Sequence, residues 1–282
     1  MVVFPNAKLN LGLRIIERLS NGYHAIETIF LPVELCDIIE IVPLPEVQGV
    51  DQWQQSGVII EEKAEENTVL RTLHMLREEG YPIPPLSVEL VKKIPFGAGL
   101  GGGSADAAFM LKALNEMFHL ELSTERMASM IKRIGADCPF FIHNTPMLGE
   151  GIGDVLTPLA LPSSIKRAQI LLIKPPIFIS TKEAYSAISC RPEAKNSLKD
   201  LFQSPLSLWK ELFINDFEEP LFKVYPLLKE IKEYIYALGA DYASMSGSGS
   251  TLYGIFTRSI PPLTDAPFRE ESYFVWQGKL IQ

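Results

Sequence analysis

Residues 95–105 read Pro95-Phe96-Gly97-Ala98-Gly99-Leu100-Gly101-Gly102-Gly103-Ser104-Ala105. Five of the seven positions from 97 to 103 are glycine, and they stand between a strand-like run at 86–91 and a helical pattern over about 104–118. A loop without side chains lets backbone N–H groups converge on an anion, and the following helix directs the positive end of its dipole to the same place. The stretch therefore predicts a phosphate-binding loop at the start of a helix.

Three other interpretations of this loop are weaker. A Walker A loop needs Lys and then Ser or Thr after its second glycine, whereas Gly102 is followed by Gly103 and Ser104. Gly97, Gly99 and Gly102 satisfy the dinucleotide pattern, but that pattern belongs to a βαβ unit, and here a second helix follows the first. A plain connector does not need so many glycines, because each one raises the entropic cost of folding.

The composition is that of an ordinary globular protein, and it limits the partners. The chain has 282 residues, enough for one large or two medium domains, with 47% hydrophobic and 21% charged residues. The formal net charge is −8 and no basic run occurs, which argues against general nucleic-acid binding. An anionic ligand is expected to be held by local geometry instead.

Cysteines, histidines and hydropathy indicate a protein of the reducing cytosol. The three cysteines are few and widely spaced, which is poor material for disulfides, and the four histidines form no ligand spacing with them. We therefore expect no structural metal site. No signal-like or transit-like segment starts the chain, and no run approaches the roughly 20 apolar residues of a membrane span. These features predict a cytoplasmic protein without membrane contact.

The order of the elements predicts the α+β class with mostly antiparallel strands and a domain boundary near residue 155. Asn67 is the expected N-cap of a helix, and Gly149, Gly151 and Gly153 are expected to form a hairpin turn. Strands are predicted at 2–4, 9–16, 38–42, 58–60, 86–91, 170–173, 243–245, 251–256 and 272–277, and later helices at 124–134, 181–188 and 221–238.

Three segments together resemble the GHMP kinases (galactokinase, homoserine kinase, mevalonate kinase and phosphomevalonate kinase). The central motif of that family is similar to residues 95–105, and its C-terminal glycine-rich motif is similar to Ser244-Met-Ser-Gly-Ser-Gly-Ser250. The N-terminal motif is similar to Asn6-Ala-Lys8-Leu-Asn10. All three occur in the family's order, and the similarity extends from Pro5 to about Phe256.

Within the superfamily the sequence most resembles the kinases of 4-diphosphocytidyl-2-C-methyl-D-erythritol, which belong to the non-mevalonate (methylerythritol phosphate) route of isoprenoid and terpenoid biosynthesis. The resemblance is carried by 5–13, by Asn21-Gly-Tyr-His24 with Glu27-Thr28, by Gly135-Ala-Asp-Cys-Pro-Phe-Phe141, and by Gly149-Glu-Gly-Ile-Gly153. It implies ATP-dependent phosphorylation of the 2-hydroxyl of that cytidine diphosphate-linked sugar alcohol.

The resemblance also implies the architecture and the site. It implies a two-domain GHMP kinase fold, with a ribosomal-protein-S5-domain-2-like ATP-binding domain over 1–155 and an α/β-plait domain over 156–282. Lys8 and Asp137 match the family's catalytic pair, and residues 95–105 match its ATP loop. The implied substrate-binding residues are Asn10, Tyr23, His24, Tyr185, Gly247 and Gly249.

These residue types suit phosphoryl transfer, although each has an ordinary structural explanation. Asp137 can accept a hydroxyl proton, and a nearby Lys8 would keep the carboxylate ionised. Taken alone, Asp137 is more commonly a turn residue and Lys8 a solvated strand lysine. Tyr23 and His24 offer a π-face and polar atoms to a base, and Tyr185 is equally well a core aromatic. Gly247 and Gly249 also suit a tight turn, and Cys138 is interpreted as a buried small residue.

Some alternatives stay open at this point. No acidic residue is an evident Mg²⁺ ligand, although Asp106, Glu150 and Asp154 are candidates, and the metal is expected to be carried by ATP. The acceptor could be mevalonate, homoserine or a sugar, or the chain could be a non-catalytic ligand-binding relative. The chain is expected to be a monomer or a weak homodimer.

Overall fold

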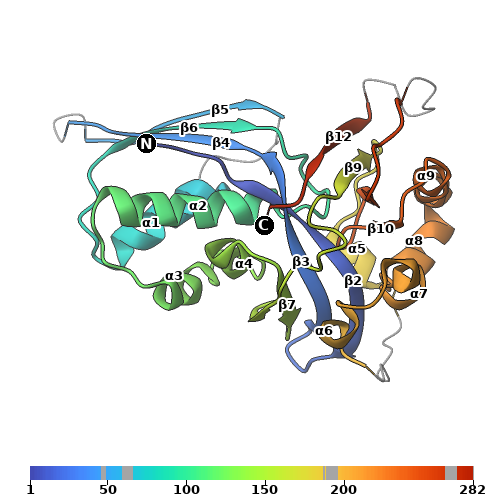
Figure 1. Ribbon diagram of the computed structural model, residues 1–282. Coiled ribbons are helices and arrows are strands. Elements are labelled where there is room, and N and C mark those ends of the chain that lie inside the picture. Colours follow the sequence, from blue (N-terminus) through green and yellow to red (C-terminus); the bar gives the residue numbers. More distant parts are fainter. Residues whose placement is uncertain (46–48, 59–65, 187, 189–195, 264–271, 282) are drawn as a thin grey trace. The chain divides into compact units, whose positions relative to one another are not determined.

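Contacts between residues divide the chain into two units, and each unit is made of segments that are separated in the sequence (Figure 1). The computed structural model describes residues 1–45, 49–58, 66–186, 188, 196–263 and 272–281. Unit 1 consists of Met1–Ala7, Leu35–Phe96 and Gly101–Asn144, and unit 2 of Lys8–Glu34, Gly97–Leu100 and Thr145–Gln282. These units differ from the division expected near residue 155, because an early strand segment and part of the glycine loop pack with the later part of the chain.

Unit 1 is built on one four-stranded sheet in the order β1-β4-β6-β5, formed by Val2–Val3, Ile38–Pro43, Leu86–Lys92 and Gln52–Gly57. The β5–β6 pair is parallel, and the other pairs are antiparallel. Alternate residues of β6 are buried, as expected of a sheet with one covered face. The helices of unit 1 are α1 (Thr68–Glu78), α2 (Gly102–Met117), α3 (Thr124–Ile131) and α4 (Cys138–His143). Helices α1 and α2 lie along the sheet in Figure 1.

Unit 2 contains two four-stranded sheets. The first has the order β2-β3-β7-β8, formed by Asn6–Arg18, His24–Cys36, Met147–Glu150 and Val155–Pro158, with most of β2 and β3 in this unit. The second has the order β10-β11-β9-β12, formed by Tyr242–Met245, Leu252–Phe256, Gln169–Lys174 and Phe274–Lys279. This sheet carries the apolar core that positions the serine-rich loop described below.

Short helices complete unit 2, and the last two cover the second sheet. Ile231 and Ile235 of α9 are fully buried with Ala243 and Met245 of β10 in one apolar cluster, which packs α9 against the second sheet. The helices of the unit are α5 (Thr181–Ser186), α6 (Leu198–Leu201), the 3₁₀ helix Leu206–Leu208, α7 (Trp209–Leu212), α8 (Glu218–Val224) and α9 (Pro226–Ala237).

Several boundaries differ from the sequence prediction for local reasons. The single helix predicted over 221–238 is wrong, because Tyr225 leaves the helical conformation and Pro226 occupies the first turn of a new helix. Proline has no N–H to donate and is therefore tolerated there and not in a helix interior. The glycine-loop helix begins at Gly102, before the predicted Ser104. The strand predicted at 58–60 lies mostly outside the described residues.

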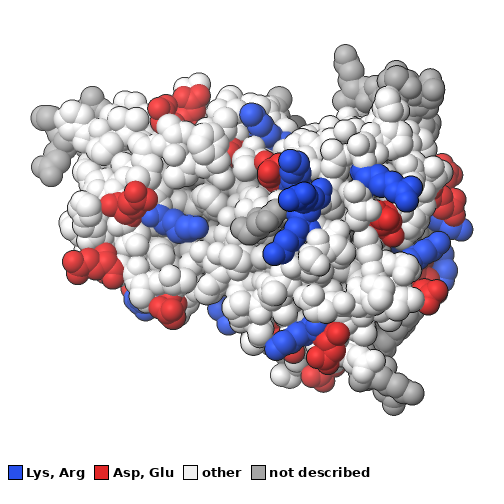
Figure 2. Space-filling view, in the orientation of Figure 1, with Lys and Arg blue, Asp and Glu red and all other residues white. Residues whose placement is uncertain are grey.

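Two local predictions, the helix cap at Asn67 and the glycine hairpin, are confirmed. Asn67 caps α1 through its Oδ1, which accepts from Val69 N–H at 2.9 Å, and the glycine hairpin joins β7 to β8. Lys and Arg side chains form only small groups on the face seen in Figure 2, and several stand beside Asp or Glu. No described helix is long and apolar enough to cross a bilayer.

Candidate functional site

The strand β2 of unit 2 holds Lys8 and Asn10 in a buried hydrogen-bond network. The Lys8 ammonium donates to Asn10 Oδ1 at 2.5 Å and lies 5.4 Å from the centre of the Phe30 ring. Asn10 Nδ2 in turn donates to Thr28 Oγ1 at 3.1 Å. Lys8 is only 3% exposed, so the interpretation as a solvated strand lysine is wrong. A buried ammonium held by oriented polar groups is typical of a functional site.

Two glycine-containing loops meet backbone to backbone within unit 2. Ser246 Oγ donates to Gly99 O at 2.8 Å and accepts from Asn10 N–H at 3.3 Å. A Cβ added at Gly99 would lie 1.9 Å from Ser246 O, and Gly99 has a φ of +72°. Only glycine fits such a contact in this conformation. The first and third regions of family resemblance, 6–10 and 244–250, thus meet at the glycine segment 97–100.

Gly247 lies next to the same network. Its φ is +56°, and an added Cβ would approach Asn10 Oδ1 to 3.1 Å. Gly249 also has a positive φ, of +90°. At Gly97 an added Cβ would lie 2.5 Å from the Phe178 ring, whose side chain is largely exposed. Close backbone approach, and not flexibility, therefore explains why glycines occur in both loops.

The aromatic residues form a second group in unit 2. The His24 and Tyr185 rings stack, with centroids 4.6 Å apart and planes 17° from parallel. Tyr185 also packs against Phe217 in a T-shaped arrangement with centroids 5.0 Å apart, so the ring contacts both His24 and a residue of the core. Tyr23 is 60% exposed, which leaves an aromatic ring available at this surface. The structure thus brings together His24 and Tyr185, which are far apart in the sequence.

In unit 1 the rest of the glycine loop forms the start of α2. Gly101 is the N-cap, with a φ of +72° and no side-chain hydrogen bond to the helix, so Ser104 does not cap it. A Cβ added at Gly103 would meet no atom closer than 3.6 Å. Thr68 Oγ1 of α1 donates to Gly103 O at 2.8 Å and steadies this turn. The first N–H groups of α2 therefore have no side-chain acceptor of their own, which suits an anion.

Asp137 stands beside that turn in the same unit. It is the N-cap residue of the short helix α4, without a side-chain cap bond. A Cβ at Gly135 would lie 3.1 Å from Cys138 Sγ and 3.5 Å from Ser104 Oγ, so the Asp137 segment packs against the first turn of α2. Burial raises the pKa of the Cys138 thiol to about 12, which agrees with its interpretation as an inert buried residue. Lys8 belongs to unit 2 and Asp137 to unit 1.

A buried ionic cluster under the start of α2 was not found from the sequence. The Lys92 ammonium contacts carboxylate oxygens of Asp37 and, at 2.7 Å, of Asp106. Asp37 Oδ1 also accepts the backbone N–H groups of Lys93 and Ile94. Burial, partly opposed by Lys92, raises the pKa of Asp106 to about 7. One oxygen of Asp106, Oδ2, is thus engaged by Lys92, and the role of Mg²⁺ ligand considered from the sequence stays a prediction.

The other suggested metal ligands are also engaged or isolated. Asp154 Oδ1 accepts from Ile152 N–H at 3.1 Å within the hairpin, and Glu150 lies exposed at the end of β7. Among the described residues no three His, Cys, Asp or Glu side chains gather as metal ligands would.

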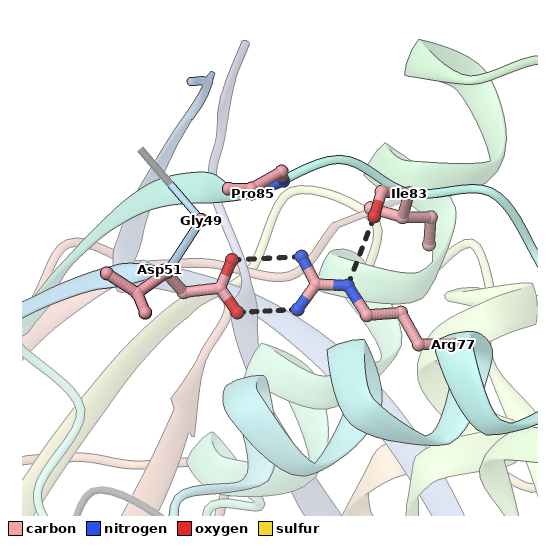
Figure 3. Close-up of a pocket in the computed structure, with 6 residues that line it drawn as sticks. Gly49, Asp51, Arg77, Ile83 and Pro85 are labelled. Atoms are coloured by element: carbon pink, nitrogen blue, oxygen red, sulfur yellow. Dashed lines mark hydrogen bonds and ion pairs between the residues drawn. The ribbon is translucent and has the colours of Figure 1, made fainter. Parts of the chain in front are cut away.

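Unit 1 also has a surface pocket, lined by Gly49, Val50, Asp51, Arg77, Ile83 and Pro85 (Figure 3). The Arg77 guanidinium makes two bonds to the Asp51 carboxylate, at 2.5 and 2.9 Å, and donates to Ile83 O at 3.2 Å. Burial alone would raise the pKa of Asp51, but the bonds from Arg77 and Leu86 N–H outweigh it, and the net shift is downward. The charged and polar groups of this pocket therefore hydrogen-bond to one another. Their bonds connect Arg77 of α1 to Asp51, next to β5, and to Leu86 of β6 through Asp51.

The sequence of the chain matches family models and relatives of known family. Residues 67–145 match the model of the GHMP kinases N terminal domain, and residues 195–265 match the model GHMP kinases C terminal. A 4-diphosphocytidyl-2-C-methyl-D-erythritol kinase of Azobacteroides pseudotrichonymphae is 45% identical over 263 residues, which cover 93% of this chain and 96% of the relative. The corresponding kinase of Bacteroides fragilis is 46% identical over 258 residues, 91% of this chain and 92% of the relative.

A solved structure agrees with these relatives. The crystal structure of a 4-(cytidine 5'-diphospho)-2C-methyl-D-erythritol kinase superposes with a TM-score of 0.80 at 29% identity and covers all of both chains. The match extends over both described units and both sheets of unit 2. It also includes the tail beyond Phe256, for which the sequence offered no motif.

Proposed function

The chain belongs to the GHMP kinases, and we propose from this membership that it transfers the γ-phosphoryl group of ATP to the 2-hydroxyl of 4-diphosphocytidyl-2-C-methyl-D-erythritol. Relatives with this name are 45% and 46% identical over more than nine-tenths of the chain. The chain is therefore an ATP-dependent kinase whose product enters isoprenoid synthesis. The identity to these relatives carries the proposal, and the junction of the two glycine loops beside Lys8 and Asn10 supports it.

The ATP site is proposed at residues 95–105. Backbone N–H groups at the uncapped start of α2 and in the glycine turns would hold phosphate oxygens, since Gly101 has a positive φ and Gly103 leaves open space. When bound, ATP supplies the phosphoryl group, and Mg²⁺ supplies positive charge at its oxygens. We propose that the cation is carried by the nucleotide, because the described carboxylates form no metal cluster.

Lys8 and Asp137 are proposed as the catalytic pair. Asp137 would accept the proton of the acceptor hydroxyl, and the Lys8 ammonium would counter negative charge as it develops. The bond from Lys8 to Asn10 supports this role, since it fixes the direction of a buried ammonium that otherwise has many rotamers. Asn10 is accordingly proposed to orient Lys8 as well as to face the acceptor alcohol.

The substrate's cytosine ring is proposed to bind at Tyr23, His24 and Tyr185. The exposed Tyr23 ring and the stacked His24–Tyr185 pair offer π-faces, and histidine adds a donor and an acceptor for the edge of the base. Gly247 and Gly249 are proposed to receive the substrate's phosphates through their backbone. Their positive φ angles turn the backbone of this loop away from a strand conformation.

Three further properties are part of the proposal. We propose a cytoplasmic enzyme without nucleic-acid or membrane partners, and the net charge of −8 supports the absence of nucleic-acid partners. We propose a monomer or weak homodimer. We also keep a division at residues 1–155 and 156–282 as a proposal for the evolutionary domains, alongside the contact-based units.

The experiment that tests the catalytic assignment compares the wild-type protein with Asp137→Asn. The wild type should convert the cytidyl alcohol to its phosphate, whereas D137N should lose at least about 100-fold in kcat, the usual scale for a general base. Nucleotide binding, measured by calorimetry, should stay within about threefold of wild type. Near wild-type turnover by D137N would show that this carboxylate is not the base. Absence of product from the wild type, despite nucleotide binding, would favour a non-catalytic relative.

A further inference from the structure

The loop Ser246–Ser250 is held on one side by a buried asparagine in the segment that precedes α8. Asn215 is 1% exposed, and its Nδ2 donates to Met245 O and to Gly247 O, both at 2.8 Å. Its Oδ1 accepts from Phe217 N–H at 3.0 Å, which fixes the orientation of the amide. One side chain thus holds the carbonyl groups on either side of Ser246.

A buried glutamate completes the support. Glu218 Oε1 accepts from Met245 N–H at 2.8 Å and from Ser244 Oγ at 3.0 Å, and Oε2 accepts from the Lys232 ammonium at 2.6 Å. The N–H and the C=O of Met245 are therefore both held by side chains of the same short segment. We call Asn215 and Glu218 the loop brace.

The brace is also tied to the strand that carries Lys8 and Asn10. Leu13 N–H donates to Ile214 O at 2.9 Å, and Asp216 N–H donates to Leu13 O at 2.8 Å. Ile15 N–H donates to Asp216 Oδ2 at 2.8 Å. The segment 214–216 thus pairs with β2 through its backbone. The side chain of Asn215, within this segment, and that of Glu218, just after it, hold the serine-rich loop and the strand before it. On the other side, that loop is bound by Asn10 and Gly99 through Ser246.

We propose that Asn215 and Glu218 are positioning residues for phosphoryl transfer, because they fix the backbone of the Ser246–Ser250 loop relative to Lys8 and Asn10. The inference rests on the proposed function, in which this loop receives the substrate's phosphates. Backbone donors stabilise charge best when they need no reorganisation during the reaction. A loop with several glycines has high conformational freedom, so its preorganisation has to come from outside the loop.

The chemistry of Asn215 predicts which replacements fail. Aspartate has the same shape but no N–H to donate, so in Asn215→Asp its oxygens would face Met245 O and Gly247 O. Alanine removes the contacts without this repulsion. For Glu218, glutamine retains an oxygen that can accept from Ser244 and Met245, whereas alanine retains none. The expected order of activity is therefore wild type, then E218Q, then E218A, with N215A and N215D both strongly impaired.

The test measures steady-state kinetics of these variants at a temperature where circular dichroism shows each to be folded. N215D and N215A should lose about 10- to 100-fold in kcat, the scale expected when reacting groups are slightly misplaced, with the KM for ATP changed less than about threefold. Hydrogen–deuterium exchange should be faster at the amides of 246–250. E218Q should recover most of the kcat that E218A loses.

The matched control is Asn115→Ala in unit 1. Asn115 makes the same kind of bridge, since its Nδ2 donates to Leu122 O at 3.2 Å and its Oδ1 accepts from Leu122 N–H at 2.9 Å. N115A should melt at a lower temperature and keep wild-type kcat. If folded N215D keeps the wild-type kcat, or if N115A loses as much kcat as N215D, this inference is overturned and the proposed function still stands. Absence of product from the wild-type protein would instead overturn the proposed function.

Discussion

Asp106 illustrates how a single buried residue can set the pH response of the molecule. Its carboxylate shares the Lys92 ammonium with Asp37, and its second oxygen, Oδ1, has no hydrogen-bond partner among the described residues. Burial raises its pKa from 3.8 to about 7, whereas in the unfolded chain it would titrate near its ordinary value. Between these pH values the folded state binds a proton that the unfolded state has lost.

The first prediction follows from that difference. A raised folded-state pKa means that the contribution of Asp106 to stability is greatest below about pH 4 and declines until about pH 7, above which it is constant. Asp106→Asn removes this titration, because asparagine stays neutral. Urea unfolding from pH 4.5 to 8 should show a smaller decline in unfolding free energy with pH for D106N than for wild type. Parallel curves for the two proteins would show that Asp106 has an ordinary pKa.

The second prediction concerns the contact between the two glycine loops. Gly99→Ala would place a Cβ 1.9 Å from Ser246 O, in addition to the strain of a φ of +72°. Gly80 has a φ of +87° with no atom within 4 Å of an added Cβ, so Gly80→Ala measures the strain alone. We expect G80A to cost about 1 kcal/mol of unfolding free energy and G99A clearly more. Equal costs in chemical denaturation would show that the loops are not in contact.

At the scale of elements, the sequence predicted the parts whose signals are local. The glycine loop, the hairpin after β7 and the cap at Asn67 depend on neighbours in the chain, and all three are confirmed. The strand His24–Cys36 was missed, because it is buried on both faces over much of its length and shows no alternation. Helices α8 and α9 were merged because their apolar periodicity continues across Pro226.

The residues that support the candidate site were beyond the reach of local patterns. Lys92 meets partners 55 and 14 positions away, and Asn215 meets carbonyl groups 30 and 32 positions away. A single charged or amide residue in a sequence does not reveal whether it is buried or which distant group it contacts. The resemblance to a known family supplied the residues that are proposed for catalysis and binding, but it did not supply the residues that hold them in place.

The third prediction belongs to helix α1. Asn67 Oδ1 accepts from Val69 N–H at 2.9 Å, and Thr68 beside it holds Gly103 O of the glycine loop. Asn67→Ala should lower the unfolding free energy by about 1 kcal/mol, whereas Asn67→Asp should retain the cap. Denaturant titration of the two variants measures the difference. If both variants lose the same stability, the cap is not the source of the effect of Asn67.

In the whole molecule, the residues proposed as functional are distributed over both units. Unit 1 contains the start of α2 and Asp137, and unit 2 contains Lys8, Asn10, the serine-rich loop and the aromatic residues. The segments 8–34 and 97–100 belong to unit 2 although they are flanked in sequence by unit 1. Each unit consequently contains residues that are distant along the chain, and neither corresponds to one continuous half of the sequence.

The central claim is the choice of substrate, and one measurement tests it most directly. The purified protein is incubated with Mg-ATP and one alcohol in each reaction. The alcohols are 4-diphosphocytidyl-2-C-methyl-D-erythritol, mevalonate, homoserine and galactose, and the masses of the products are measured by mass spectrometry. The account predicts a product heavier by one phosphate only with the cytidyl alcohol, whose base would contact Tyr23, His24 and Tyr185. A phosphorylated product from one of the other alcohols, with none from the cytidyl compound, would contradict it.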